Sequence, residues 1–238
     1  MEYMTKAEIQ KWHKKFLGWI EHIRDEIREN GLTFDCRLVG SAKRHLVIRH
    51  HNKGFDLDFQ IILHKNKNQL SEKDIKKLFI DLLNPLVVAE GFEYCKDSTS
   101  AITIKMVDAE KSKIITGYDV VLLKRKTVDG VENTEILRHY KDRKPEIWTF
   151  ERLPDMTNAS EQFCKIKGPE MWQDLRERYY DKKTNNKSDK KSFQLLHEAV
   201  RNDKTIRRKL KWQKQQRQNK RKVWKRPFGN RRINCAAQ

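Results

Sequence analysis

The sequence lacks the features that would place it among membrane proteins or disulfide-rich secreted proteins. Four cysteines occur in 238 residues, and they are scattered, without a Cys-x-x-Cys pair or a histidine at zinc-finger spacing. We therefore expect ordinary reduced thiols. No apolar run approaches the roughly 18 residues of a membrane span, and the amphipathic N-terminus has no signal-peptide core. These absences favour a cytoplasmic protein with no membrane partner.

Acidic residues are scarce toward the C-terminal end. From Lys182 to Arg232 the chain holds 20 lysines or arginines and three acidic residues, which accounts for +17 of the total formal charge of +19. A solvated helix face is the alternative explanation of such a charge run. The density favours a nucleic-acid partner, because neutralised phosphates release counterions and tryptophans can stack on bases. The residues expected to bind nucleic acid are Arg207, Arg208, Lys211, Trp212, Lys214, Arg221, Lys222 and Trp224.

The rest of the chain is nearly neutral and predicts an α+β fold. Apolar residues at three- and four-residue steps predict helices over 5–31 and 71–90, and two-residue alternation predicts strands over 33–39 and 55–63. Residues 101–107 and 114–123 are typical of a hairpin. We expect a small mixed β-sheet core with flanking helices over 1–127, a helical C-terminal lobe over 128–201 that opens with an irregular linker to Pro154, and a basic tail over 202–238.

Two carboxylates lie on one predicted strand, at Asp56 and Asp58. The strand alternates, with Leu57 and Phe59 on the opposite face, so both aspartates point away from the core. Side chains at alternate positions are roughly 6–7 Å apart along a strand and can hold Mg²⁺ between them. Two such ions can activate an attacking oxygen and neutralise a leaving pyrophosphate. Considered alone, the pair is better explained as the solvated face of a half-buried strand.

A third carboxylate normally completes such a metal site. Asp119 is the candidate, because it lies in an apolar strand where an unpaired acid would be costly. Asp108 is the competitor, although its position in a predicted turn favours simple solvation.

A Gly-Ser pair follows the strand that precedes the two carboxylates. Gly40 lets the backbone approach phosphate closely, and the Ser41 hydroxyl and neighbouring N–H groups could hold a triphosphate. Lys43 adds positive charge beside this turn. The alternative for Ser41 is an ordinary turn residue.

These residues in this order resemble the polymerase-β-like nucleotidyltransferase superfamily, which includes poly(A) polymerases, oligoadenylate synthetases and bacterial second-messenger synthases. The resemblance covers roughly residues 1 to 125. It implies that Asp56 and Asp58 bind two Mg²⁺ or Mn²⁺ ions, that Asp119 binds the catalytic ion and takes the acceptor's proton, and that Ser41 holds the triphosphate. The fourteen-residue spacer from Ala42 to Phe55 is longer than the superfamily pattern.

The resemblance and the basic tail together predict a function. We expect a Mg²⁺-dependent nucleotidyltransferase that transfers a nucleoside monophosphate from an NTP to an acceptor hydroxyl, with RNA favoured over DNA by analogy with the superfamily. One alternative is a synthase of oligo- or cyclic nucleotides that nucleic acid activates. The other is a catalytically degenerate RNA-binding protein on this scaffold. The oligomeric state is left open.

Overall fold

The structure is a computed structural model of the chain, and it describes residues 1–51, 54–153, 163, 166, 168–186 and 190–201. The chain divides into two compact units, Met1–Asp155 and Met156–Gln238.

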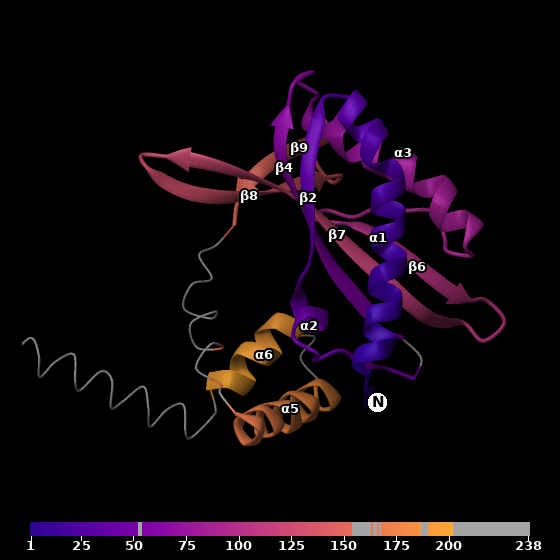
Figure 1. Cartoon of the computed structure of the whole chain (residues 1–238), viewed down its shortest axis with the longest axis vertical. Helices are drawn as coiled ribbons and strands as arrows, with labels where there is room; N and C mark the ends of the chain where they lie inside the picture. Colours follow the sequence, from indigo (N-terminus) through magenta and orange to yellow (C-terminus); the bar gives the residue numbers. More distant parts are fainter. Residues whose placement is uncertain (52–53, 154–162, 164–165, 167, 187–189, 202–238) are drawn as a thin grey trace, which may run out of the picture. The chain divides into compact units, whose positions relative to one another are not determined.

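A seven-stranded mixed sheet forms the centre of the first unit (Figure 1). Its central pair, β4 and β7, is parallel, and the other neighbouring pairs are antiparallel. The strand order is β2–β4–β7–β6–β5, and β8 continues from β7 to β9. The strands are β2 (Leu32–Leu38), β4 (Asp56–Asn66), β5 (Lys96–Asp97), β6 (Ile102–Asp108), β7 (Lys113–Val128), β8 (Val131–Tyr140) and β9 (Ile147–Arg152).

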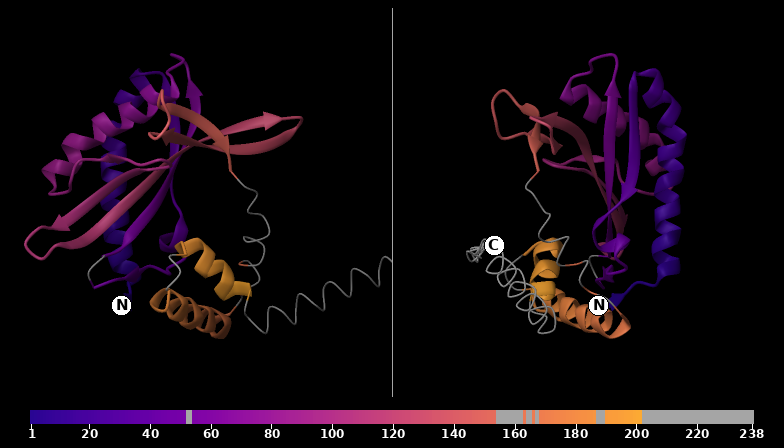
Figure 2. Two further views of the ribbon diagram at one scale, coloured as in Figure 1. Left: turned by 180° about the vertical axis from the view of Figure 1, so that it is seen from behind. Right: turned by 60° about the vertical axis from the view of Figure 1, so that its left-hand side comes forward.

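Two long helices, α1 (Lys6–Glu29) and α3 (Glu72–Ala89), cover one face of this sheet (Figure 2). Under them, Phe59 and Tyr118 are fully buried, and the ring of Phe16 lies 4.0 Å from the ring of Phe59 and 5.3 Å from that of Tyr118. Each such side chain contributes roughly 1.5–3 kcal/mol by its burial. The Tyr118 hydroxyl also donates to the Trp12 carbonyl over 3.1 Å. The core therefore lies on the helical side of the sheet.

The helices and strands predicted for the first 125 residues are confirmed. The first helix begins with the expected capping box, in which Thr5 and Glu8 hydrogen-bond each other's backbone N–H groups. The second helix continues through Pro85, and β6 and β7 form the expected antiparallel hairpin. The α+β class is therefore confirmed as well.

The predicted linker from Val128 to Pro154 is wrong, because most of it is strand. β8 pairs with the second half of β7, from Leu123↔Ile136 to Val128↔Val131, and β9 pairs with β8. The segment looked irregular because the turn end of the β7–β8 hairpin is exposed and polar. Within β8, only Ile136 and Leu137 are consecutive apolar residues. The first compact unit accordingly runs to Asp155 and not to Thr127.

The described part of the long spacer between Ser41 and Asp56, residues 42–51 and 54–55, is a structured insertion. It begins with the last two residues of the short helix α2 (Gly40–Lys43) and contains strand β3 (Ile48–Arg49), which pairs with β1 (Glu2–Tyr3). The apolar run from Leu46 to Ile48 is buried, and Val47 accepts a backbone hydrogen bond from Met4 over 3.0 Å. The insertion thus fastens the N-terminus of the chain beside the start of β4.

In the second unit, the structure describes helices α5 (Pro169–Thr184) and α6 (Ser192–Arg201), as the sequence predicted. Leu175, Tyr179 and Leu196 are buried, and Lys182 forms an ion pair of 3.2 Å with Glu198. The basic tail from residue 202 to 238 lies outside the described residues, and so do all eight predicted nucleic-acid-binding residues.

Cys36 and Cys95 are free thiols, and burial raises both pKa values to about 12. They are therefore protonated and unreactive at neutral pH. Among the described residues, the helices are all too short or too polar to cross a bilayer.

Candidate active site

The pairing of β4 with β7 brings the predicted acidic residues onto neighbouring strands. Asp58 lies directly beside Asp119, and Asp56 lies beside Gly117. Adjacent positions in a parallel pair point to the same face, and alternate positions along a strand do so too. The intervening Leu57 and Tyr118 are buried under the helices. All three aspartates therefore lie on the face of the sheet opposite α1 and α3.

Two glycines pack directly against these carboxylates. A Cβ atom added at Gly40 would clash with the Asp58 carboxylate, and one added at Gly117 would clash with the Asp56 carboxylate. Gly40 has φ +63°, a left-handed conformation that side chains other than glycine rarely adopt. Two features therefore require glycine at position 40, namely its left-handed backbone conformation and its close approach to Asp58.

Backbone hydrogen bonds hold the Gly-Ser segment to the start of β4 and to the insertion that follows it. Val39 N–H donates to the Asp58 carbonyl over 2.9 Å, and the Ser41 carbonyl accepts from Leu46 N–H over 2.9 Å. Lys43 is exposed on the last position of α2. The structure therefore places Gly40 and Ser41 beside the acidic pair, as expected, in the first turn of a short helix.

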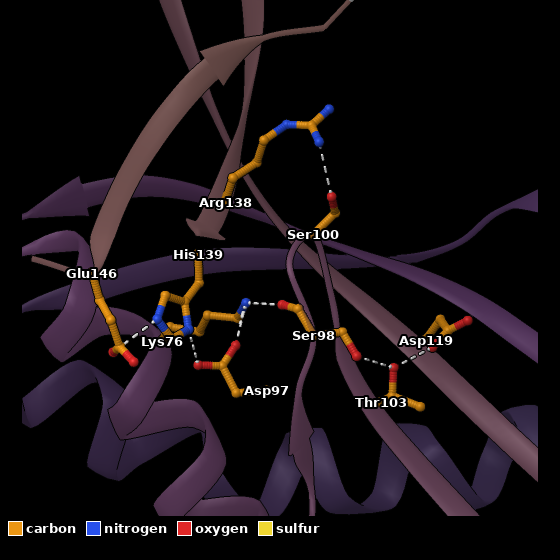
Figure 3. Close-up of polar contacts among 9 residues, drawn as sticks. All are labelled: Lys76, Asp97, Ser98, Ser100, Thr103, Asp119, Arg138, His139 and Glu146. Atoms are coloured by element: carbon orange, nitrogen blue, oxygen red, sulfur yellow. Dashed lines mark hydrogen bonds and ion pairs between the residues drawn. The ribbon is translucent and has the colours of Figure 1, made fainter. Parts of the chain in front are cut away.

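Asp119 is oriented by a residue that the sequence analysis missed. Thr103 lies opposite Asp119 in the β6–β7 register, and its hydroxyl donates to Asp119 Oδ1 over 2.7 Å (Figure 3). Alternation in Ile102–Asp108 places Thr103 on the polar face of β6, but the sequence does not show which residue of the next strand it faces. The hairpin register supplies that information.

The rival third acid, Asp108, lies at the far end of the hairpin. It pairs opposite Lys113 and forms an ion pair of 3.2 Å with Lys111. The backbone N–H of Lys111 is the main reason why the pKa of Asp108 is lowered. Asp108 is five positions from Thr103 on the same strand, roughly 17 Å at about 3.3 Å per residue. The register therefore separates Asp108 from Asp56 and Asp58.

The donor set suits a hard divalent cation. Carboxylate oxygens are the ligands that Mg²⁺ prefers, and the glycines at 40 and 117 leave room for Asp58 and Asp56 where a side chain would intrude. In the part of the chain that the structure describes, no group of three or more His, Cys, Asp or Glu side chains is gathered closely enough to hold a metal ion. Asp56, Asp58 and Asp119 have the right ligand atoms for Mg²⁺, and the β4–β7 register places them on one face of the sheet. Their carboxylates must move closer together to bind one ion.

No protein-family model and no curated protein sequence matches the chain, but several solved structures resemble it. The GTP-bound DncV of Vibrio cholerae is 19% identical, with a TM-score of 0.50, over 84% of this chain and 57% of DncV. DncV cyclic AMP-GMP synthase with the linear intermediate pppA(3′,5′)pG is 17% identical, with a TM-score of 0.50, over 85% of this chain and 60% of DncV. The STING-associated c-di-GMP synthase CdnE of Capnocytophaga granulosa is 15% identical, with a TM-score of 0.47, over 82% of this chain and 61% of CdnE.

The chain spans 57–61% of the length of these three structures. At these identities the likeness concerns the fold. The resemblance inferred from the motifs is confirmed at the level of the fold, because the chain shares its fold with DncV, which is described as a cyclic AMP-GMP synthase. The chain has the fold of the polymerase-β-like nucleotidyltransferases.

Proposed function

We propose that this chain is a Mg²⁺-dependent nucleotidyltransferase that transfers a nucleoside monophosphate from an NTP to a hydroxyl of a second nucleotide, releasing pyrophosphate. The observation that carries the proposal is the β4–β7 register. It aligns Asp58 with Asp119 and leaves Asp56 on the same face. The Gly40-Ser41 segment, tied to β4 through Val39, adjoins this row.

Each residue has a distinct role in this reaction. Asp56, Asp58 and Asp119 would hold the divalent ions, and Asp119 would accept the proton of the attacking hydroxyl. Gly40 allows the backbone to approach the triphosphate, and Ser41 binds it through its hydroxyl and N–H groups. The ions supply charge neutralisation for the attacking and leaving oxygens when bound.

The structural neighbours, rather than the basic tail, support the choice of acceptor. DncV is described as a cyclic AMP-GMP synthase and was solved with a linear dinucleotide intermediate. This supports a nucleotide acceptor, and hence an oligo- or cyclic-nucleotide synthase, in preference to the RNA acceptor that we first expected. In this proposal the basic tail would bind an activating nucleic acid through its phosphates.

The proposal is tested by incubating the full chain with each α-labelled NTP and Mg²⁺, with and without RNA, and separating the products by chromatography. We expect a labelled soluble nucleotide product and released pyrophosphate. Asp56→Asn, Asp58→Asn and Asp119→Asn should each lower the rate by about 10⁴-fold or more, as loss of a central catalytic group does in other enzymes.

Asp108→Asn is the matched control, because it makes the same chemical change on the same hairpin away from the three aspartates. It should keep the wild-type rate. Label that enters RNA would contradict the nucleotide acceptor while keeping the transferase. Absence of transfer from every NTP would refute the proposed activity as a whole.

A further inference from the structure

A chain of hydrogen bonds leads from Asp119 into the interior of the first unit (Figure 3). Thr103 Oγ1 donates to Asp119 Oδ1 over 2.7 Å, and Ser98 Oγ lies 3.1 Å from Thr103 Oγ1. A threonine hydroxyl has one proton, and a carboxylate only accepts. Because Thr103 gives its proton to Asp119, Ser98 is the donor to Thr103. The donors therefore all point toward the Asp119 carboxylate.

Ser98 is fixed by a buried lysine. Lys76, on α3, is 2% exposed, and its Nζ donates to the Ser98 carbonyl over 2.6 Å. Asp97 Oδ1 lies 2.5 Å from the same nitrogen. Burial lowers the pKa of Lys76, and Asp97 opposes this by favouring the charged form. A buried ammonium is stable only with such a partner, so Lys76 and Asp97 lock the loop that carries Ser98.

The same loop is also fixed from β8 and β9. His139 Nδ1 lies 2.7 Å from Asp97 Oδ2, and its Nε2 lies 3.2 Å from Glu146. The His139 ring stacks on Trp148 with centroids 3.8 Å apart and an interplanar angle of 16°. Three elements, α3, β8 and β9, therefore hold the segment from Asp97 to Ser98. The donor of the Thr103 hydroxyl thus sits on a rigid support.

We propose that Thr103 is a positioning residue for Asp119, held in turn by Ser98 and the buried Lys76–Asp97 pair. With Oδ1 bonded to Thr103, the second oxygen of Asp119 is turned away from Thr103 (Figure 3) and is preset to bind a divalent ion. Loss of a hydrogen-bond partner of a metal ligand typically lowers metal affinity about 10–100-fold. The inference rests on the proposed function, because it assumes that Asp119 is a metal ligand.

The test measures metal binding directly. Mn²⁺ is titrated into the full chain in the presence of a non-hydrolysable NTP analogue, and free Mn²⁺ is followed by electron paramagnetic resonance. Thr103→Val keeps the size of the side chain and removes the donor, so Mn²⁺ affinity should fall about 10–100-fold. Thr103→Ser retains the hydroxyl and should restore affinity close to the wild-type value.

Thr116→Val is the matched control. Thr116 lies on β7 and is fully buried, and its hydroxyl is without a hydrogen-bond partner in the described structure. The same substitution there should leave Mn²⁺ affinity unchanged. Ser98→Ala should give a smaller loss than Thr103→Val, because Thr103 keeps its own proton for Asp119. Ser98→Ala also tests the hydrogen-bond network without changing a residue of β6 or β7.

Two failures are distinguishable. If the wild-type chain binds Mn²⁺ and Thr103→Val binds it equally well, the positioning role is refuted while the proposed function stands. The same conclusion follows if Thr103→Ser is as weak as Thr103→Val. If the wild-type chain neither binds Mn²⁺ nor turns over any NTP, the metal site is refuted and this inference falls with it.

Discussion

At the scale of single residues, the candidate site depends on two glycines, which have no side chain, as well as on the three aspartates. Gly40 and Gly117 each occupy a position where a Cβ atom would strike an aspartate carboxylate. Gly117 lies beside Asp56 in the parallel pairing and has no left-handed backbone conformation. Substitution at Gly117 therefore isolates the steric effect on Asp56 from backbone strain.

We predict that Gly117→Ala weakens Mn²⁺ and NTP binding by at least about tenfold, because Asp56 must rotate away from its present position. The free energy of unfolding should change by less than about 1 kcal/mol, since the displaced group is the end of a flexible side chain and alanine is favoured over glycine within a strand. Mn²⁺ titration and urea denaturation measure the two quantities.

Gly18→Ala is the control for this substitution. Gly18 lies on the exposed face of α1, and a Cβ atom there has no neighbour within 4 Å. Alanine should stabilise the helix by about 0.5–1 kcal/mol and leave Mn²⁺ affinity unchanged. Equal Mn²⁺ affinity in Gly117→Ala and wild type would show that Asp56 does not need its present position.

At the scale of elements, the start of α1 joins the helix to the insertion that precedes β4. Thr5 and Glu8 form the capping box, and Arg49 of β3 donates to Glu8 Oε1 over 2.8 Å. The backbone N–H of Thr5 and then Arg49 are the main causes that lower the pKa of Glu8 to about 2. The Glu8 carboxylate thus both caps helix α1 and binds Arg49 of β3.

We predict that Thr5→Ala lowers the free energy of unfolding by about 1 kcal/mol through loss of the cap. Glu8→Gln should be destabilising at neutral pH, and its difference from wild type should shrink as the pH falls. The sign follows because a depressed folded-state pKa stabilises the fold above the unfolded value near 4.5 and loses that contribution as pH falls toward about 2. Urea denaturation at several pH values checks both.

Glu21→Gln on the same helix is the control for the pH dependence, because Glu21 pairs with Arg24 at the surface. Its effect should stay within about 0.5 kcal/mol. A wild-type minus Glu8→Gln difference that is constant from pH 7 to pH 3 would contradict the assignment of Glu8 as the titrating cap.

At the scale of the whole molecule, charge and chemistry occupy different parts of the chain. The three aspartates and the Gly-Ser segment lie in the first compact unit, whereas +17 of the net formal charge of +19 lies from Lys182 to Arg232. A polycation of this density is expected to bind nucleic acid through its phosphates. Nucleotide binding and nucleic-acid binding should therefore be separable by truncation.

We predict that a chain ending at Arg201 loses salt-sensitive binding of labelled RNA while it keeps Mn²⁺ and NTP binding. If the tail neutralises about six phosphates, the full chain should lose roughly a thousandfold in RNA affinity between 50 and 200 mM salt. Fluorescence anisotropy of the labelled RNA measures RNA affinity and its salt dependence, and Mn²⁺ titration measures the retained metal binding. A flat salt response of the full chain would remove the electrostatic argument for a nucleic-acid partner.

Much of the fold could be predicted because it depends on local patterns. The capping box at Thr5, the helical spacing of α1 and the alternation around Leu57 and Phe59 each specify an element and its buried face. The same alternation predicted that Asp56 and Asp58 point away from the core. The strands β8 and β9 were missed because the exposed end of the β7–β8 hairpin is polar in composition. Pairing of β8 with β7 outweighs the low local strand propensity of this segment.

The sequence by itself determined the order of the motifs, the α+β class and the face on which Asp56 and Asp58 lie. Tertiary structure alone decided that Asp119 and not Asp108 lies beside them, that Gly117 leaves room for Asp56, and that Thr103 hydrogen-bonds Asp119. The physical reason is that periodicity along one strand is a local property. Register between strands depends on long-range hydrogen bonding and packing, and a shift of one residue would turn each side chain to the other face.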